Sequence, residues 1–237
     1  GYLPEALVNY LALIGWSPGG DEELLPIQEL ARRFALEDVG HSAGVFDQEK
    51  LAWVNRHYLK TAHHRRLAEL SLPYLQQVGW IATATADDLE FLTHIVPSAA
   101  ASVDRLEQVP RRLAFLFDYS AEKALDIPQI REEASDARAV IDALAGELAV
   151  SGPLIDRDAF RSAAGRVRDK TGQKGKALFH PIRLALTGEA EGLELDLAVP
   201  AIERGAALDR SSGIRQIPSA RERAVRFAST LSQRPRA

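Results

Sequence analysis

The sequence predicts an all-α protein, because apolar residues recur every three or four positions along most of its 237 residues. Ala and Leu, which favour helices, are plentiful, whereas aromatic residues make up only 7% of the chain. Strict alternation of apolar and polar residues never runs beyond a few positions, and strands do not alternate with helices. The pattern predicts about a dozen helices.

The first third of the chain predicts four of these helices. Residues 3–14 carry an apolar stripe after Pro4 and end at Gly15, and residues 27–34 form a shorter helix. Residues 46–59 form the third helix, with Asp47 as a suitable N-cap and with Trp53 and Asn55 outside the apolar stripe. A fourth pattern covers residues 67–78.

Prolines interrupt several of the predicted helices, because a proline inside a helix removes a hydrogen bond and clashes with the preceding turn. Breaks are expected at Pro73, at Pro97 within the helical stretch 86–106, and at Pro200 within 193–202. Residues 130–150 show a strong, uninterrupted pattern.

The C-terminal part offers clear helix boundaries. A helix is expected to begin near Asp156 and to run to residue 171, and the last helix, residues 219–231, begins with a capping box made by Ser219 and Glu222. The segment Arg204–Ile217 before it reads as a loop, and Arg204, Arg210 and Arg215 there either contact phosphates or bridge helices.

The stretch 172–188, GQKGKALFHPIRLALTG, combines a loose basic start with an apolar helix. Pro181 suits the first turn of that helix, and Gly188 suits its end. Arg183 lies within the apolar run and must either reach solvent, bind groups of its own fold or meet an anion. The loop with Lys174 and Lys176 is a candidate phosphate-binding element.

Charge is distributed unevenly along the chain. Residues 1–150 hold 13 Lys/Arg and 23 Asp/Glu, a net charge of −10, and residues 151–237 hold 16 and 10, a net charge of +6. A basic half of this kind suits a polyanionic partner, although charge alone is more often typical of solvated helix faces.

Several classes of function are excluded by the sequence. The chain lacks Cys, so thiolate metal sites are excluded, and the adjacent His63 and His64 point about 100° apart on a helix, which makes them a poor metal pair. The basic loop fails the phosphate-loop pattern, because Lys170 replaces its first Gly and Ala177 its Ser or Thr. We therefore expect no metal site and no catalytic residue. No stretch is long and apolar enough for a membrane helix, and a cytoplasmic protein is expected.

Three sequence blocks carry a family resemblance: GYLPEALVNYLALIGWS (1–17), FDQEKLAWVNRHYL (46–59) and GKALFHPIRLALTG (175–188). In order and spacing they resemble the C-terminal part of bacterial glutamyl-tRNA synthetases, which are class I aminoacyl-tRNA synthetases. The resemblance implies an all-α, multihelical array: a stem-contact region at 1–61, then two helical anticodon-binding subdomains at 62–118 and 119–237.

The resemblance also implies which residues meet tRNA(Glu). Arg183 matches the arginine of the anticodon-contacting helix, and Thr187 and the loop ending at Leu193 match the segment that touches bases. Lys174 and Lys176 are suited to contact phosphates, and His180 is placed to stack or to cap the helix. Lys50, Trp53 and Asn55 match a structural pattern of the family, with roles in packing and helix orientation.

Ser102 occupies the position where strictly discriminating members can carry an arginine, which implies a relaxed enzyme that also accepts tRNA(Gln). The HIGH-type and KMSKS-type signatures are absent, so ATP and Mg²⁺ are expected only with a catalytic domain outside this chain. Because the sequence also lacks Met, even at Gly1, we expect a piece of a glutamate–tRNA ligase. Without the two catalytic signatures it should have no activity of its own, and we expect it to be a monomer. The alternative is a helical scaffold for a protein partner.

Overall fold

The computed structural model describes residues 1–19, 22–40, 44–209 and 211–234. Within these ranges it contains thirteen α-helices, two short 3-10 helices and one isolated antiparallel bridge between Ile81 and Ile214. The predicted all-α class is confirmed. None of the described helices is both long and apolar enough to cross a membrane.

Contacts between residues divide the chain into two compact units. The first unit comprises Gly1–Val78 and Leu92–Arg111, and the second comprises Gly79–Phe91 and Arg112–Ala237. The division falls inside two helices, α5 (Ala86–Ala100) and α6 (Val109–Phe117). The finer boundaries at 61/62 and 118/119 stay a prediction.

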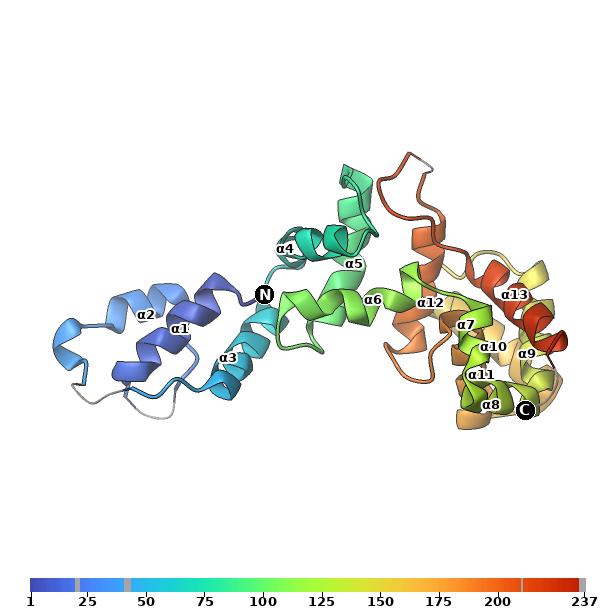
Figure 1. Cartoon of the computed structure of the whole chain (residues 1–237), viewed down its shortest axis with the longest axis horizontal. Coiled ribbons are helices and arrows are strands. Elements are labelled where there is room, and N and C mark those ends of the chain that lie inside the picture. Colours follow the sequence, from blue (N-terminus) through green and yellow to red (C-terminus); the bar gives the residue numbers. More distant parts are fainter. Residues whose placement is uncertain (20–21, 41–43, 210, 235–237) are drawn as a thin grey trace. The chain divides into compact units, whose positions relative to one another are not determined.

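Besides parts of α5 and α6, the described part of the first unit contains four α-helices and two 3-10 helices, and its most extensive helix contact joins α1 to α3 (Figure 1). They are α1 (Pro4–Gly15), α2 (Ile27–Arg33), the 3-10 helix η1 (Leu36–Asp38), α3 (Gln48–Thr61), α4 (His64–Gln77) and the 3-10 helix η2 (Leu106–Gln108). Asp47 caps α3 as expected, accepting hydrogen bonds from the backbone N–H groups of Glu49 and Lys50.

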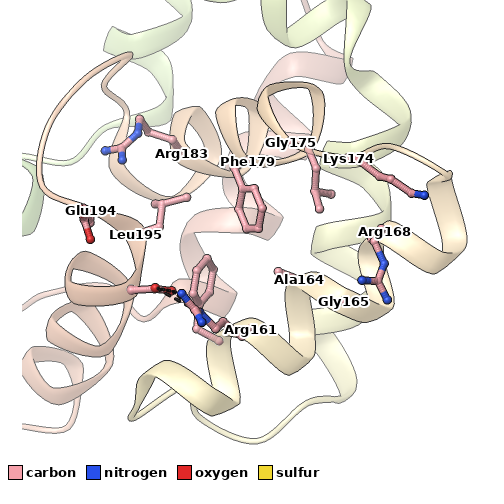
Figure 2. Close-up of a pocket in the computed structure, with 13 residues that line it drawn as sticks. Arg161, Ala164, Gly165, Arg168, Lys174, Gly175, Phe179, Arg183, Glu194 and Leu195 are labelled. Carbon is pink, nitrogen blue, oxygen red and sulfur yellow. Dashed lines mark hydrogen bonds and ion pairs between the residues drawn. The ribbon is translucent and has the colours of Figure 1, made fainter.

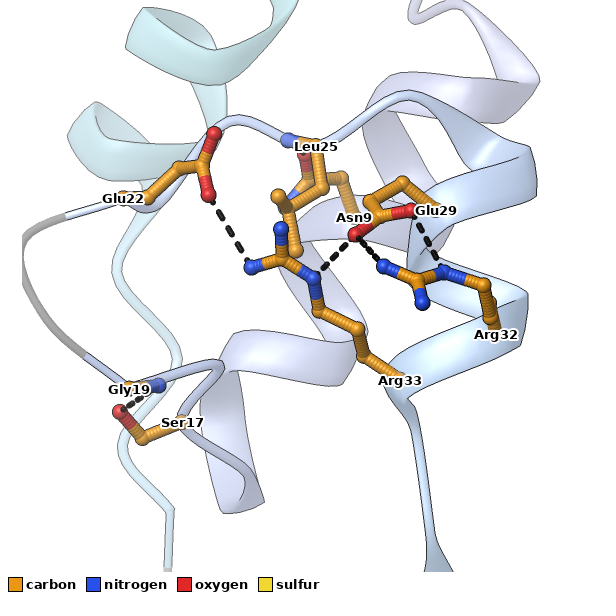
Figure 3. Close-up of polar contacts among 8 residues, drawn as sticks. All are labelled: Asn9, Ser17, Gly19, Glu22, Leu25, Glu29, Arg32 and Arg33. Atoms are coloured by element: carbon orange, nitrogen blue, oxygen red, sulfur yellow. Dashed lines mark hydrogen bonds and ion pairs between the residues drawn. The ribbon is translucent and has the colours of Figure 1, made fainter.

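Two buried asparagines join the segments of this unit. The Asn55 side chain accepts from the Leu3 N–H at 2.8 Å and donates to the Asp104 carbonyl at 2.5 Å. Asn9 accepts from the Leu25 N–H at 3.0 Å, and beside it Glu29 forms ion pairs with Arg32 and Arg33 (Figure 3). An amide that serves an N–H and a carbonyl at once fixes how two segments approach each other.

The second unit is built mainly from α9, α10, α11 and α13 (Figure 1). Its helices are α7 (Ala121–Asp126), α8 (Pro128–Asp136), α9 (Arg138–Val150), α10 (Arg157–Thr171), α11 (Lys176–Thr187), α12 (Leu195–Ala206) and α13 (Ala220–Ser232). The predicted caps are confirmed: Asp156 accepts from the Ala159 N–H, Ser219 and Glu222 form the capping box, and Gly188 ends α11 in the left-handed conformation at φ 74°.

The proline predictions are wrong in one respect. Pro73, Pro97, Pro181 and Pro200 all lie inside continuous helices, and α11 begins at Lys176 rather than near Pro181. Pro181 and Pro200 are buried, and their helices pack against several neighbours. The packing of these helix faces outweighs the hydrogen bond that each proline removes. Conversely, the uninterrupted pattern 130–150 is divided at Ala137 between α8 and α9.

The segment Arg204–Ile217 begins in α12 and then runs beside residues 80–88. Its backbone pairs with the Trp80 carbonyl and the Ala82 N–H, and the buried Asp88 accepts from Ser212 and Gly213. Arg215 pairs with Asp118 at 2.7 Å, so it bridges parts of the fold, whereas Arg204 is exposed. Arg210 lies outside the described residues.

Candidate nucleic-acid interface

The loop between α10 and α11 presents the two lysines that the sequence selects. Gly172 and Gly175 have φ values of 71° and 53°, a conformation that suits glycine, and they turn the chain sharply on either side of Lys174. Lys174 and Lys176 are exposed. The tight loop therefore holds two cationic groups in solvent at the start of α11.

Arg183 is half-buried on α11, and its Nη1 donates to the Leu193 carbonyl at 2.9 Å. Burial lowers the pKa of Arg183, while Glu189 opposes that shift. The guanidinium has five N–H donors, and among the described residues only this one hydrogen bond from it is found. Arg183 thus holds the loop 188–194 through one N–H donor, and its other donors can bind a ligand in the groove.

Thr187 and Glu189 complete the end of α11. Thr187 is 3% exposed, and its hydroxyl lies 2.8 Å from the Arg183 carbonyl and accepts from the Glu189 N–H at 3.2 Å. Burial raises the pKa of Glu189, an effect that Arg183 and Arg112 oppose. The Glu189 carboxylate and the Arg183 guanidinium both approach Gly192, whose lack of a side chain leaves them room.

A groove of about 610 Å³ opens between α10, α11 and the start of α12 (Figure 2). Figure 2 shows Phe179 pointing from α11 into this groove, with Arg168 and Lys174 on one side and Arg183 and Glu194 on the other. Arg161 also lines it, but Asp196 accepts hydrogen bonds from Arg161 at 2.7 Å and from Arg157 at 2.9 Å. We call this hollow the Phe179 groove.

The predicted contact residues do not all share that groove. Lys174 and Arg183 line the Phe179 groove, whereas Lys176 and His180 line a second hollow, next to Glu133 and Asp136. His180 Nε2 lies 2.7 Å from Glu133 Oε2, so its ring binds a side chain of α8. Leu193 joins the first group through its carbonyl. Contact of any of these residues with RNA stays a prediction.

The other selected residues belong to the first compact unit. Ser102 is exposed just after α5, and its hydroxyl donates to the Ala99 carbonyl at 2.9 Å. Asn55 is fully buried, Lys50 pairs with Glu23 at 2.7 Å, and Trp53 is 42% exposed on α3. Asn55 thus links Leu3 to Asp104 through its hydrogen bonds, while Trp53 keeps an exposed face.

Sequence reasoning missed Phe179, Arg161 and Arg168 as groove residues. Phe179 reads as one more apolar residue of the helix, and the arginines read as part of a basic surface. The available signal was spacing: Phe179 and Arg183 are four positions apart on α11, and Arg161, Ala164, Gly165 and Arg168 repeat along one face of α10.

Residues 66–212 match the family model of an anticodon binding domain, which covers more than half of the chain. The chain belongs to the anticodon binding domain family. Residues 1–53 match the model of the catalytic domain of class I tRNA synthetases (E and Q). The resemblance carried by the three sequence blocks is thereby confirmed, and the Phe179 groove lies within the matched anticodon-binding segment.

Individual relatives agree with this assignment. The chain is 33% identical over 212 residues to a glutamate–tRNA ligase of Desulforamulus reducens, covering 89% of this chain and 44% of the relative. It is 37% identical over 203 residues to that of Alkaliphilus metalliredigens, covering 84% and 40%. The chain therefore spans less than half the length of these curated relatives.

A solved structure supports the fold across the chain. A glutamate tRNA ligase from Elizabethkingia meningosepticum, crystallised in complex with its amino acid, aligns with a TM-score of 0.68 at 18% identity. The alignment covers 98% of this chain and 41% of that one.

Proposed function

We propose that this chain binds the anticodon loop of tRNA(Glu) through its second compact unit and presents that tRNA to a class I catalytic domain. The observation that carries the proposal is the anticodon-binding match over residues 66–212, which contains the basic groove between α10 and α11. In this proposal the ATP- and Mg²⁺-dependent ligation of glutamate belongs to the catalytic domain.

The chemistry of the groove suits an unpaired RNA loop. Proteins recognise such loops by cationic contacts to phosphates, by hydrogen bonds to base edges and by stacking. Lys174 supplies exposed positive charge, the exposed Arg168 is paired with Asp169 at 2.9 Å, and Arg183 supplies a guanidinium fixed at one point by the Leu193 carbonyl. A fixed guanidinium loses less conformational entropy on binding than a free one.

A salt titration tests the proposal. Labelled tRNA(Glu) is titrated with the chain across a series of NaCl concentrations, and the logarithm of the binding constant should fall linearly with the logarithm of salt concentration. Arg183→Ala should cost roughly 1–3 kcal/mol of binding free energy, and Lys174→Ala should reduce the salt slope by about one. Lys123→Ala, on an exposed residue of α7 that lines neither hollow, is the matched control.

Two outcomes contradict the proposal. Either tRNA(Glu) binds no better than an unrelated RNA of the same length, or Arg183→Ala binds like the unaltered chain while both keep the same midpoint of thermal unfolding. If the chain binds no RNA even at low salt, the alternative hypothesis of a scaffold for a protein partner is favoured instead.

We propose further that recognition is relaxed towards tRNA(Gln), since Ser102 offers a short hydroxyl where discriminating relatives can place an arginine. The dissociation constants of the two tRNAs are then similar. Ser102→Arg should weaken tRNA(Gln) more than tRNA(Glu), and a large preference of the unaltered chain for tRNA(Glu) would contradict relaxed recognition.

A further inference from the structure

Phe179 is the one large apolar side chain of α11 that is exposed. It is 41% exposed, whereas Leu178 and Ile182 beside it are 2% and 0% exposed. An exposed aromatic residue by itself is ordinary on a protein surface. Here, however, its ring projects into a groove that also carries arginine and lysine side chains (Figure 2).

The face of α10 that lies across the groove from Phe179 carries two small residues. It carries Ala164 and Gly165 between Arg161 and Arg168. A Cβ atom built at Gly165 would meet no heavy atom within 4 Å, so the space directly above this glycine is open. A glycine inside a helix costs about 1 kcal/mol relative to alanine. The open space therefore comes at a cost in helix stability.

Charge is placed unevenly around the ring. Arg168 and Lys174 lie on one side of Phe179, and Arg183 and Glu194 lie on the other (Figure 2). Arg168 forms an ion pair with Asp169 at 2.9 Å, and Arg161 forms one with Asp196 at 2.7 Å. Lys174 attracts a phosphate to its own side of the ring, whereas Glu194 offsets the positive charge of Arg183 on the other side. An unpaired nucleotide has the matching form, with a flat apolar face on one end and an anion on the other.

We propose that the Phe179 groove holds one unpaired base of the RNA loop, stacked on the Phe179 ring over Ala164 and Gly165, with its phosphate toward Arg168 and Lys174. This inference rests on the proposed function and adds a stacking residue and an orientation to it. Stacking reads no base edge, so Phe179 contributes affinity and position while sequence is read elsewhere.

The test uses the whole chain and a hairpin with the anticodon stem and loop of tRNA(Glu), in which 2-aminopurine replaces each loop base in turn. Stacking on an aromatic ring quenches the fluorescence of 2-aminopurine. The unaltered chain should quench one loop position strongly. Phe179→Leu should abolish that quenching and weaken binding roughly 5- to 150-fold, the range for losing one stacked base. Phe179→Tyr, which keeps the ring, should retain both.

A second pair of variants tests the groove without touching Phe179. Gly165→Leu fills the open space and should weaken binding of the hairpin at least as much as Phe179→Leu does. Gly146→Leu is the matched control, because Gly146 is also a helix glycine with no neighbour within 4 Å, and it lines neither hollow. It should leave binding unchanged.

The outcomes separate this inference from the proposed function. If the unaltered chain binds the hairpin no better than an unrelated hairpin, the proposed function and the stacking site both fail. If it binds specifically but Phe179→Leu keeps the same affinity and quenching, only the stacking site is overturned. Equal effects of Gly165→Leu and Gly146→Leu would also overturn it.

Discussion

Arg223 on α13 is fully buried, and its replacement should destabilise the second unit more than that of any exposed arginine. Its Nη1 donates to the carbonyls of Phe115 and Leu186 at 2.6 and 3.0 Å, its Nη2 to that of Leu116 at 2.8 Å, and its Nε to that of Pro218 at 2.9 Å. The guanidinium therefore donates hydrogen bonds to carbonyls in the last turns of α6 and α11, where carbonyls lack helical partners.

Two further contacts surround this group. The Tyr119 ring centroid lies 4.5 Å from the Arg223 guanidinium carbon, and the Tyr119 hydroxyl lies within hydrogen-bond distance of the Ala185 and Arg223 carbonyls, at 2.8 and 3.0 Å. Burial lowers the pKa of Arg223 to about 10, which leaves it charged at neutral pH. Positive charge at the C-terminal ends of two helices is favourable, because the helix dipole is negative at that end.

The size of the effect follows from these contacts. Arg223→Met leaves three buried carbonyls without a partner, at roughly 1–3 kcal/mol each, and the partly buried carbonyl of Pro218 at less, whereas the removal of a buried charge offsets several kcal/mol of this loss. The net loss in free energy of unfolding should be about 4 kcal/mol. Arg223→Lys keeps the charge but offers three donors from one atom, so about 2 kcal/mol is expected.

Urea unfolding followed by circular dichroism at neutral pH measures these losses. The matched control is Arg226→Met on the same helix, an exposed side chain paired with Glu122, which should change stability by at most about 1 kcal/mol. If Arg223→Met proves no more harmful than Arg226→Met, the four carbonyls do not depend on this guanidinium and the reasoning fails.

Three smaller predictions concern buried polar groups and are also measured by urea unfolding. Lys170 and Arg166 hold the pKa of Glu147 at about 2, so the stabilisation from Glu147 is present above the ordinary glutamate pKa near 4.5 and is lost as pH falls toward 2. Glu147→Gln should therefore remove this part of the acid dependence of the free energy of unfolding. An unchanged pH profile would contradict the role of Glu147. Glu203 behaves oppositely, because burial raises its pKa: stability falls as pH rises through that value, and Glu203→Gln, which keeps the acceptor for the Ala220 N–H, should be at least as stable as the unaltered chain at pH 7. A loss there would refute it. Asn55→Ala should cost about 2–3 kcal/mol, since the Leu3 N–H and the Asp104 carbonyl both lose their partner; a loss no larger than that of Lys50→Ala would argue against its orienting role.

Local signals along the chain are enough to place most helix ends in this protein. Asp47, Asp156 and Ser219 cap helices where their side chains reach backbone N–H groups two or three residues ahead, and Gly188 adopts the left-handed conformation that stops α11. These contacts lie within one turn of the chain, so residue type and spacing suffice to predict them. Prolines were misleading because the energy that keeps them inside helices comes from distant packing partners.

The groove illustrates the same division between local and distant information. Spacing places Phe179 and Arg183 on one face of α11 and Ala164 and Gly165 on one face of α10, but nothing in the sequence says that the two faces meet. Nor could spacing separate Lys174 from Lys176, which open onto different hollows only because α8 and α10 flank α11 on different sides.

The sequence by itself determined the helical class, the basic C-terminal half and, through three ordered blocks, the family. Only the tertiary structure decided that Arg223 is fully buried, that Asn55 joins Leu3 to Asp104, and that Phe179 remains exposed. The physical reason is that burial depends on which helix faces come together, and those contacts join residues that lie far apart in the chain. A charged side chain on an amphipathic helix reads as solvated until the carbonyls of two other helices are found around it.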